Sequence, residues 1–120
     1  MDITQLEQLV VSALEDIKAK DIEVINTTRL TALFERVIIA TGDSNRQTRA
    51  LARNVADKVR EAGQQVLSIE GEDSGEWVLV DLGSIVVHVM QPAVRAYYNL
   101  EELWAGTPLR AGRPSVARSA

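Results

Sequence analysis

The chain contains no cysteine and a single histidine, His88. Without cysteine the chain can form neither disulfides nor thiolate metal sites, and one histidine cannot form a histidine metal cage within one chain. We expect no metal or cofactor. A sequence without cysteine suits the cytosol, where thiols stay reduced, so we expect a cytoplasmic protein. The N-terminus, Met1-Asp2-Ile3, lacks the basic segment that opens a signal peptide, and no apolar run approaches the roughly 20 residues that span a bilayer.

Basic residues are scarce before the C-terminal segment. The sequence has 13 Lys and Arg against 17 Asp and Glu, and three of the arginines (Arg110, Arg113 and Arg118) lie in 105–120, which has no acid. The preceding part therefore has ten basic residues against 17 acidic ones, a formal charge of −7. An acidic body disfavours sequence-independent binding of nucleic acid, including free DNA, and suits docking to a basic protein surface.

The length of 120 residues is enough for one domain with its own core. We expect this domain to span 1–104 and the segment 105–120, rich in Gly, Pro, Ser and Arg, to be a disordered basic tail. Hydrophobic periodicity predicts helices near 2–19, 45–62 and from 92, with Asn99 capping a last turn over 100–104. It predicts strands near 21–26, 35–41, 65–69, 77–81 and 85–90.

These elements predict an α/β fold with a mixed five-stranded sheet and flanking helices. The run Val37-Ile38-Ile39 does not alternate with polar residues, which is typical of a strand inside a sheet. A helix links the strands at 35–41 and 65–69, so these two could run parallel. Two or three helices cannot cover both faces of five strands, and one sheet face should stay partly open.

Aromatic residues are few and concentrated. The chain has five, and four of them lie between 77 and 104: Trp77, Tyr97, Tyr98 and Trp104. Large rings fill small cores, but tryptophan and tyrosine also dominate the energetics of protein interfaces. Both interpretations stay open from composition alone.

The hairpin at 77–90 brings polar groups to one face. Alternation places Trp77, Leu79 and Asp81 together, and a two-residue loop at Leu82-Gly83 would set Trp77 opposite His88. Ser84, His88 and Asp81 are the residue types of a hydrolytic triad, yet the sequence has no G-x-S-x-G elbow. We therefore expect no catalytic residue, and interpret the face as a patch for a partner or as a half-buried histidine in a packed sheet.

Two further features of the sequence are compatible with binding of a nucleotide or of RNA. The strand-turn-helix sequence Thr41-Gly42-Asp43-Ser44 can present free N–H groups to phosphate but lacks the glycine-rich phosphate motifs, so a nucleotide-binding or nucleotidyltransferase-like protein is the alternative function. The following helix has a basic stripe, which fits either RNA contact or ion pairs with neighbouring acids. Its members are Arg46, Arg49, Arg53 and Arg60.

Six sequence blocks, in order, resemble the ribosomal silencing factor family, also called Iojap-like. They are A-L-E-D-x-K-A-x-D-I (13–22), V-I-I-A-T-G-x-S (37–44), E-G (70–71), W-V-L-V-D-L-G (77–83), V-V-H-V (86–89) and R-x-Y-Y-x-L-E-x-L-W (95–104). The resemblance covers about residues 3–104. Phe34-Glu35-Arg36 departs from it, since the family usually has an Asp-Tyr pair there.

The resemblance implies a translational repressor and not an enzyme. Proteins of this family bind the large ribosomal subunit at its ribosomal protein number fourteen, with ribosomal RNA nearby, and block joining of the small subunit. Their fold is similar to that of nucleotidyltransferases but has no recognised active site, and free members are often homodimers. Matching motif by motif, the residues expected to face the partner are Trp77, Tyr98, Tyr97, Asp81, His88, Glu70, Glu101 and Trp104.

Overall fold

The computed structural model describes residues 1–105, and its sheet has five strands in the order β1-β2-β5-β4-β3. The predicted fold class, a mixed sheet with flanking helices, is confirmed. The C-terminal tail expected at 105–120 lies, beyond its first residue, outside the described residues. The elements are α1 (Ile3–Asp16), β1 (Lys20–Asn26), β2 (Arg36–Thr41), α2 (Asn45–Glu61), β3 (Ser68–Glu70), β4 (Trp77–Asp81), β5 (Ile85–Met90), α3 (Pro92–Tyr98) and α4 (Leu100–Ala105).

Strand directions make the sheet mixed. β2 pairs with β5 in parallel, whereas β1–β2, β4–β5 and β3–β4 are antiparallel pairs. β2 and β3 therefore run in the same direction, as predicted, but β5 and β4 lie between them. β2 is an interior strand, as its unbroken apolar run predicted, and its residues 37–41 are all buried.

The helix boundaries follow local capping chemistry. Asp2 caps α1 by accepting from the Gln5 backbone N–H, and the Gln5 side chain accepts from the Asp2 N–H in return. α1 ends at Asp16, earlier than the predicted end near Ala19, because Lys18 takes a left-handed conformation (φ 63°) and the chain turns into β1. Ser44 caps α2.

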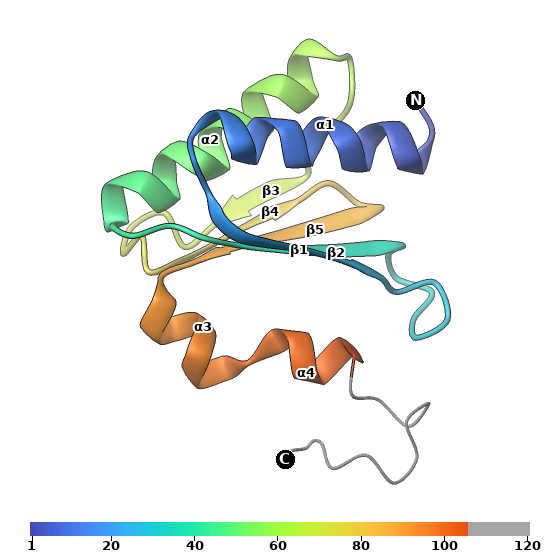
Figure 1. Cartoon of the computed structure of the whole chain (residues 1–120). Helices are drawn as coiled ribbons and strands as arrows, with labels where there is room; N and C mark the ends of the chain where they lie inside the picture. The colour runs from blue at the N-terminus through green and yellow to red at the C-terminus, as the bar shows by residue number, and fades with distance from the viewer. Residues whose placement is uncertain (106–120) are drawn as a thin grey trace, which may run out of the picture.

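The upper face of the sheet holds the main core. α1 and α2 lie side by side across this face (Figure 1), and their apolar sides pack on the sheet residues that point toward them. None of the helices within residues 1–105 has the length and apolar character needed to cross a bilayer. The fully buried side chains of this core include Val10, Leu14, Ile38, Leu51, Val55, Val59, Val78, Val80 and Ile85.

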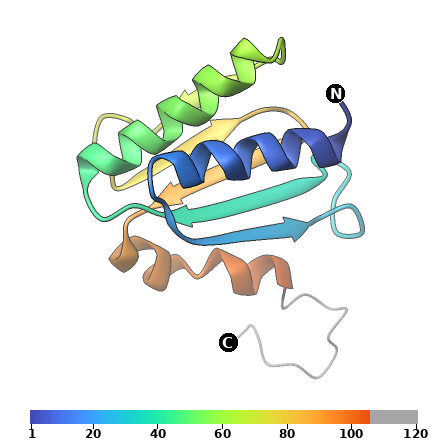
Figure 2. The ribbon, with the colours of Figure 1, turned by 45° about the horizontal axis from the view of Figure 1, so that its top comes forward.

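The lower face is covered only in part. α3 and α4 lie beneath it, on the β1 side (Figures 1 and 2). A second, smaller apolar cluster forms there around the buried residues Val37, Ile39 and Met90. No helix of the described part of the chain lies over the lower surface of β3 and β4, which confirms the expected open face.

Arg95 ties α3 to three other elements. Its Nε and Nη2 donate to Glu101 Oε2 on α4 at 2.8 and 2.6 Å, and its Nη1 donates to the Asp21 carbonyl at 2.6 Å and Thr41 Oγ1 at 2.8 Å. The Arg95 side chain is only 11% exposed. This cation therefore fixes where α3 places its other side chains beneath the sheet.

We expect Arg95→Ala to lower the free energy of unfolding by about 2 kcal/mol, because it leaves a half-buried carboxylate and two acceptors without their donor. Urea unfolding of the variant measures the loss. Arg46→Ala is the matched control, since Arg46 is exposed and makes no side-chain bond within the described residues. Equal stabilities for the two variants would show that Arg95 does not hold α3 in place.

Candidate partner-binding surface

The open face is built from alternate residues of the hairpin. Trp77, Leu79 and Asp81 of β4 point down, as do Val86 and His88 of β5, while the residues between them are buried under α1 and α2. The faces are those that alternation predicted.

The predicted register of the hairpin is wrong. Trp77 pairs with Met90, two residues beyond the expected His88, which pairs with Leu79 instead. The loop is Gly83-Ser84, because Leu82 is buried and its N–H donates to the Ile85 carbonyl, which extends the ladder by one more pair. A shift of two residues leaves each side chain on the same face of the sheet, so the predicted residues still share the open face.

Trp77 and His88 nevertheless meet, across a diagonal of the ladder. The Trp77 indole Nε1–H donates to His88 Nδ1 at 3.0 Å, and the ring centroids are 5.8 Å apart. An indole only donates, so the imidazole must be neutral, with its proton on Nε2. Burial lowers the pKa of His88 to about 4, because it disfavours the charged imidazolium. The hydrogen bond is therefore intact at neutral pH.

This arrangement is not a hydrolytic triad. His88 uses Nδ1 for Trp77, and the Asp81 carboxylate instead accepts from the Gly83 backbone N–H at 2.8 Å, bracing the hairpin turn. In the described chain, no bond joins Ser84 to His88. Residues 1–105 also contain no group of three or more Asp, Glu or His that could hold a metal ion.

We predict an acid-dependent loss of stability that depends on His88. Its pKa is about 4 when folded and 6.5 in a free side chain. Between these two pH values the unfolded chain binds a proton at His88 and the folded chain does not. Neutral His88 therefore contributes fully to the free energy of unfolding above pH 6.5, and this contribution is lost as the pH falls toward 4. Urea unfolding at pH 7 and 4.5 should show that the wild type loses ~2–3 kcal/mol more than His88→Gln. Gln supplies an acceptor without titrating, so equal losses would contradict the assignment.

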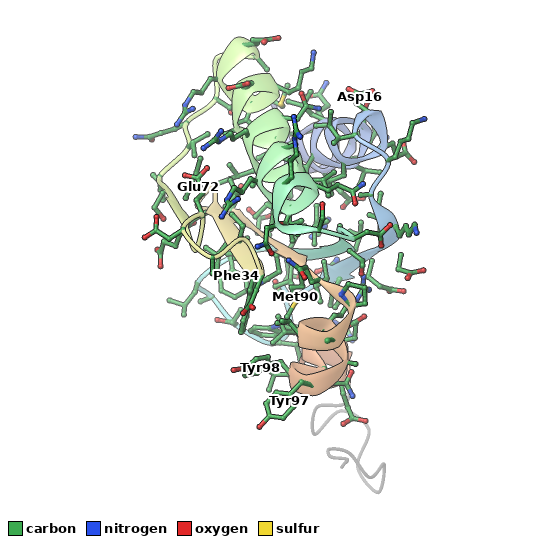
Figure 3. The ribbon with its side chains drawn as sticks, turned by 90° about the vertical axis from the view of Figure 1, so that its left-hand side faces the viewer. Asp16, Phe34, Glu72, Met90, Tyr97 and Tyr98 are labelled. Carbon is green, nitrogen blue, oxygen red and sulfur yellow. The ribbon has the colours of Figure 1, made fainter. Side chains whose placement is uncertain are left out.

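A row of rings continues from Trp77 onto α3. The Tyr98 ring lies 4.8 Å from Trp77 and 5.0 Å from Tyr97, measured between centroids. Figure 3 shows both tyrosines projecting from α3 on the side that lies below β3 and β4. Tyr97 is 82% and Tyr98 54% exposed, whereas Trp77 is half-buried. Thus the rings form an accessible ridge, anchored at one end in the lower core.

Trp104 and Glu101, also expected at the partner surface, lie apart from this row. The Trp104 ring packs edge-on against Phe34 at 5.4 Å between centroids and is half-buried in the lower cluster. Glu101 is paired with Arg95 and lines a different groove. The structure thus places them where they position α3 and α4 under the sheet.

A groove borders the ring row under β3, β4 and the β1–β2 loop. Its volume is about 480 Å³, and a shallower hollow that it adjoins is lined by Glu70, Gly71, Trp77 and Leu79. Sequence reasoning missed Leu33 and Leu67, which are 81% and 55% exposed. The sequence offered no signal for them, because Leu33 stands between Ala32 and Phe34 and Leu67 follows Val66, as buried leucines also do. The 480 Å³ groove is lined by Leu33, Phe34, Leu67, Glu70, Leu79, Asp81, Gly83 and Val86.

The loop between β3 and β4 is tightly held. Gly71 has φ 89°, and a Cβ there would lie 2.1 Å from the Trp77 carbonyl oxygen. Arg49 donates to the Glu72 and Asp73 carbonyls at 2.6 and 2.7 Å. Arg53 pairs with the Glu72 carboxylate at 3.0 Å. Two members of the basic stripe therefore bind the neighbouring acidic loop; Arg53 forms an ion pair, as that interpretation predicted, whereas Arg49 binds backbone carbonyls instead.

The turn before α2, which the alternative function would use for phosphate, is also occupied by its own side chains. Ser44 Oγ accepts from the Gln47 N–H at 3.0 Å, and Gln47 Oε1 accepts from the Asp43 N–H at 2.6 Å. Asp43 pairs with Lys20 at 2.8 Å, and this contact raises the pKa of Lys20. One N–H group in the first turn of α2 and one in the turn before it are thus already bound within the chain.

The fold defines a class: an α/β protein with a mixed five-stranded sheet that leaves part of one face open. The family model described as "Ribosomal silencing factor during starvation" matches residues 1–119. The ribosomal silencing factor of Chromobacterium violaceum is 58% identical over 106 residues, 88% of this chain and 87% of that protein. The chain belongs to the ribosomal silencing factor family. Members are ribosome-associated regulators of translation and are not known as enzymes.

Two further similarities agree with this membership. A crystal structure of a protein from Chromobacterium violaceum superposes with a TM-score of 0.87 at 55% identity, covering 96% of this chain and 92% of that one. A mouse protein named "Mitochondrial assembly of ribosomal large subunit protein 1" is 32% identical over 99 residues, 80% of this chain and 43% of that protein.

Proposed function

We propose that this protein binds the large ribosomal subunit at ribosomal protein number fourteen and thereby blocks joining of the small subunit in the cytoplasm. The accessible row of Tyr97, Tyr98 and Trp77 carries the proposal. Exposed tyrosines anchored on a half-buried tryptophan are typical of the residues that dominate interface energetics.

The charge around the row favours a basic partner. Among the described residues, Glu70 and Asp81 are the only charged ones that line the groove beside the rings. Negative charge beside exposed apolar area steers a basic surface toward the site and disfavours bare phosphate. The family resemblance supplies the choice of protein fourteen, and the name of the mouse relative supports the large subunit.

Gradient sedimentation of purified subunits tests the proposal. Wild-type protein bound first to large subunits should reduce the amount of joined ribosome formed when small subunits are added. Tyr98→Ala should restore joining, and Leu103→Ala should not, because Leu103 is a similarly exposed apolar residue (60%) on α4, outside the row. Unchanged joining in the presence of saturating wild-type protein would reject the proposal.

The nucleotide-binding alternative has one supporting observation. A groove of about 440 Å³ lies where β2 and the parallel strand β5 end, and Lys20 and Arg95 line it. Both cations are already paired, with Asp43 and Glu101, which weakens the case. A thermal-shift titration with nucleoside triphosphate and Mg²⁺ tests it, since a ligand that binds only the folded state raises its stability.

A further inference from the structure

The groove under β3 and β4 presents exposed apolar side chains. Leu33 and Leu67, on its rim, are 81% and 55% exposed, and Leu79 and Val86 line it from the sheet. Apolar area of this kind in a small protein marks a surface that another segment covers.

The charge of the groove is of one sign. Glu70 and Asp81 line it, and no basic residue within 1–105 does. Neither carboxylate forms an ion pair within residues 1–105; one Asp81 oxygen accepts from the Gly83 N–H, and Glu70 accepts a long 3.3 Å bond from Ser68. The groove therefore suits a segment that combines an apolar side chain with arginines and has no acid.

The chain itself supplies such a segment next to the groove. The Trp104 ring contacts Phe34, which lines the groove, so the chain leaves α4 beside it. Leu109 follows Ala105 by four residues, a reach of about 13 Å in extended conformation. Residues 106–120 contain three arginines and no acid.

We propose that residues 106–120 dock in the groove of their own chain, with Leu109 between Leu33 and Leu67 and the arginines facing Glu70 and Asp81. The docked segment covers apolar area next to Trp77 and competes with a partner at this face. The competition, but not the docking, rests on the proposed function.

Disulfide trapping tests the docking cleanly, because the full-length chain has no cysteine of its own. Ala32 is an exposed neighbour of Leu33, and Ala32→Cys with Ala111→Cys leaves both leucines intact. We expect a concentration-independent intramolecular disulfide under mild oxidation. Adding Leu109→Asp should slow its formation roughly tenfold, because it removes the apolar anchor. Glu70→Lys with Asp81→Lys should slow it as well.

Two outcomes would overturn the docking. A disulfide rate unaffected by Leu109→Asp and by the charge reversals would mean that the segment meets the groove only by diffusion. Disulfide-linked dimers that increase with protein concentration would mean that a second copy supplies the segment.

A second experiment tests the competition. The Leu109→Asp variant, without the added cysteines, should bind large subunits several-fold more tightly than the wild type does. Equal affinity would reject the competition. If neither protein binds, the proposed function fails, while the disulfide result still decides the docking.

Discussion

Gly71→Ala is expected to lower the free energy of unfolding by about 3 kcal/mol or more. The left-handed backbone at this position (φ 89°) costs an L-residue ~1–2 kcal/mol. A methyl group would also lie 2.1 Å from the Trp77 carbonyl oxygen, and backbone cannot rotate away as a flexible side chain can. The start of β4 must shift, at a cost typical of overpacking, about 1–3 kcal/mol. Urea unfolding measures the total.

Gly63→Ala is the matched control for this prediction. Gly63 also has a positive φ, 78°, but a Cβ there would have no atom within 4 Å. The difference between the two variants therefore isolates the contact with Trp77 from the backbone preference. If Gly71→Ala is no more destabilising than Gly63→Ala, the loop does not hold β4 as the structure indicates.

Tyr98→Ala is expected to weaken binding to large subunits by at least ~30-fold, the effect of losing a hot-spot ring. Stability should change little, because the ring is 54% exposed and its aromatic contacts are with Trp77 and Tyr97 alone among the described residues. Trp77→Ala should weaken binding at least as much, but it also opens the lower core and removes the donor to His88. Its unfolding free energy must therefore be measured alongside.

Two variants separate the ring from its neighbours. Tyr98→Phe keeps the ring and removes only the hydroxyl, so most of the affinity should remain. Leu103→Ala removes exposed apolar area of α4 outside the row and should bind as the wild type does. Affinities from co-sedimentation that are the same for Tyr98→Ala and the wild type would remove Tyr98 from the interface.

Side-chain faces could be predicted from the sequence because they depend on local periodicity. The alternation of 77–81 placed Trp77 and Asp81 on the open face, and the observed pattern agrees. The register between the two hairpin strands was harder to predict, because a loop at 82–83 and a loop at 83–84 both leave the side chains on the same faces. The burial of Leu82 decides between the two loops, and this burial depends on tertiary packing, which the local sequence does not show. For the same reason β3 lies at 68–70, where it pairs with β4, and not at the predicted 65–69.

The contacts that build the ring row join distant parts of the chain. Arg95 reaches Thr41 and the Asp21 carbonyl, on other strands, and so sets where α3 presents Tyr98 to Trp77. Trp104, grouped with the partner residues by its motif, instead packs on Phe34 from the β1–β2 connection. No spacing in the sequence encodes these distances. Composition therefore left core and interface open for the aromatics; the structure half-buries Trp77 and Trp104 and exposes Tyr97 and Tyr98.

Photo-crosslinking from position 97 tests the central claim most directly, since Tyr97 is the most exposed ring of the row. A photoreactive phenylalanine derivative at this position, mixed with separated subunits, should crosslink to one protein of the large subunit, protein number fourteen, and to nothing in the small subunit. The same group at exposed Arg60 on α2 should give no crosslink. Crosslinks from position 60 but not 97, or crosslinks of position 97 to the small subunit, would contradict a ribosome contact made through the open sheet face.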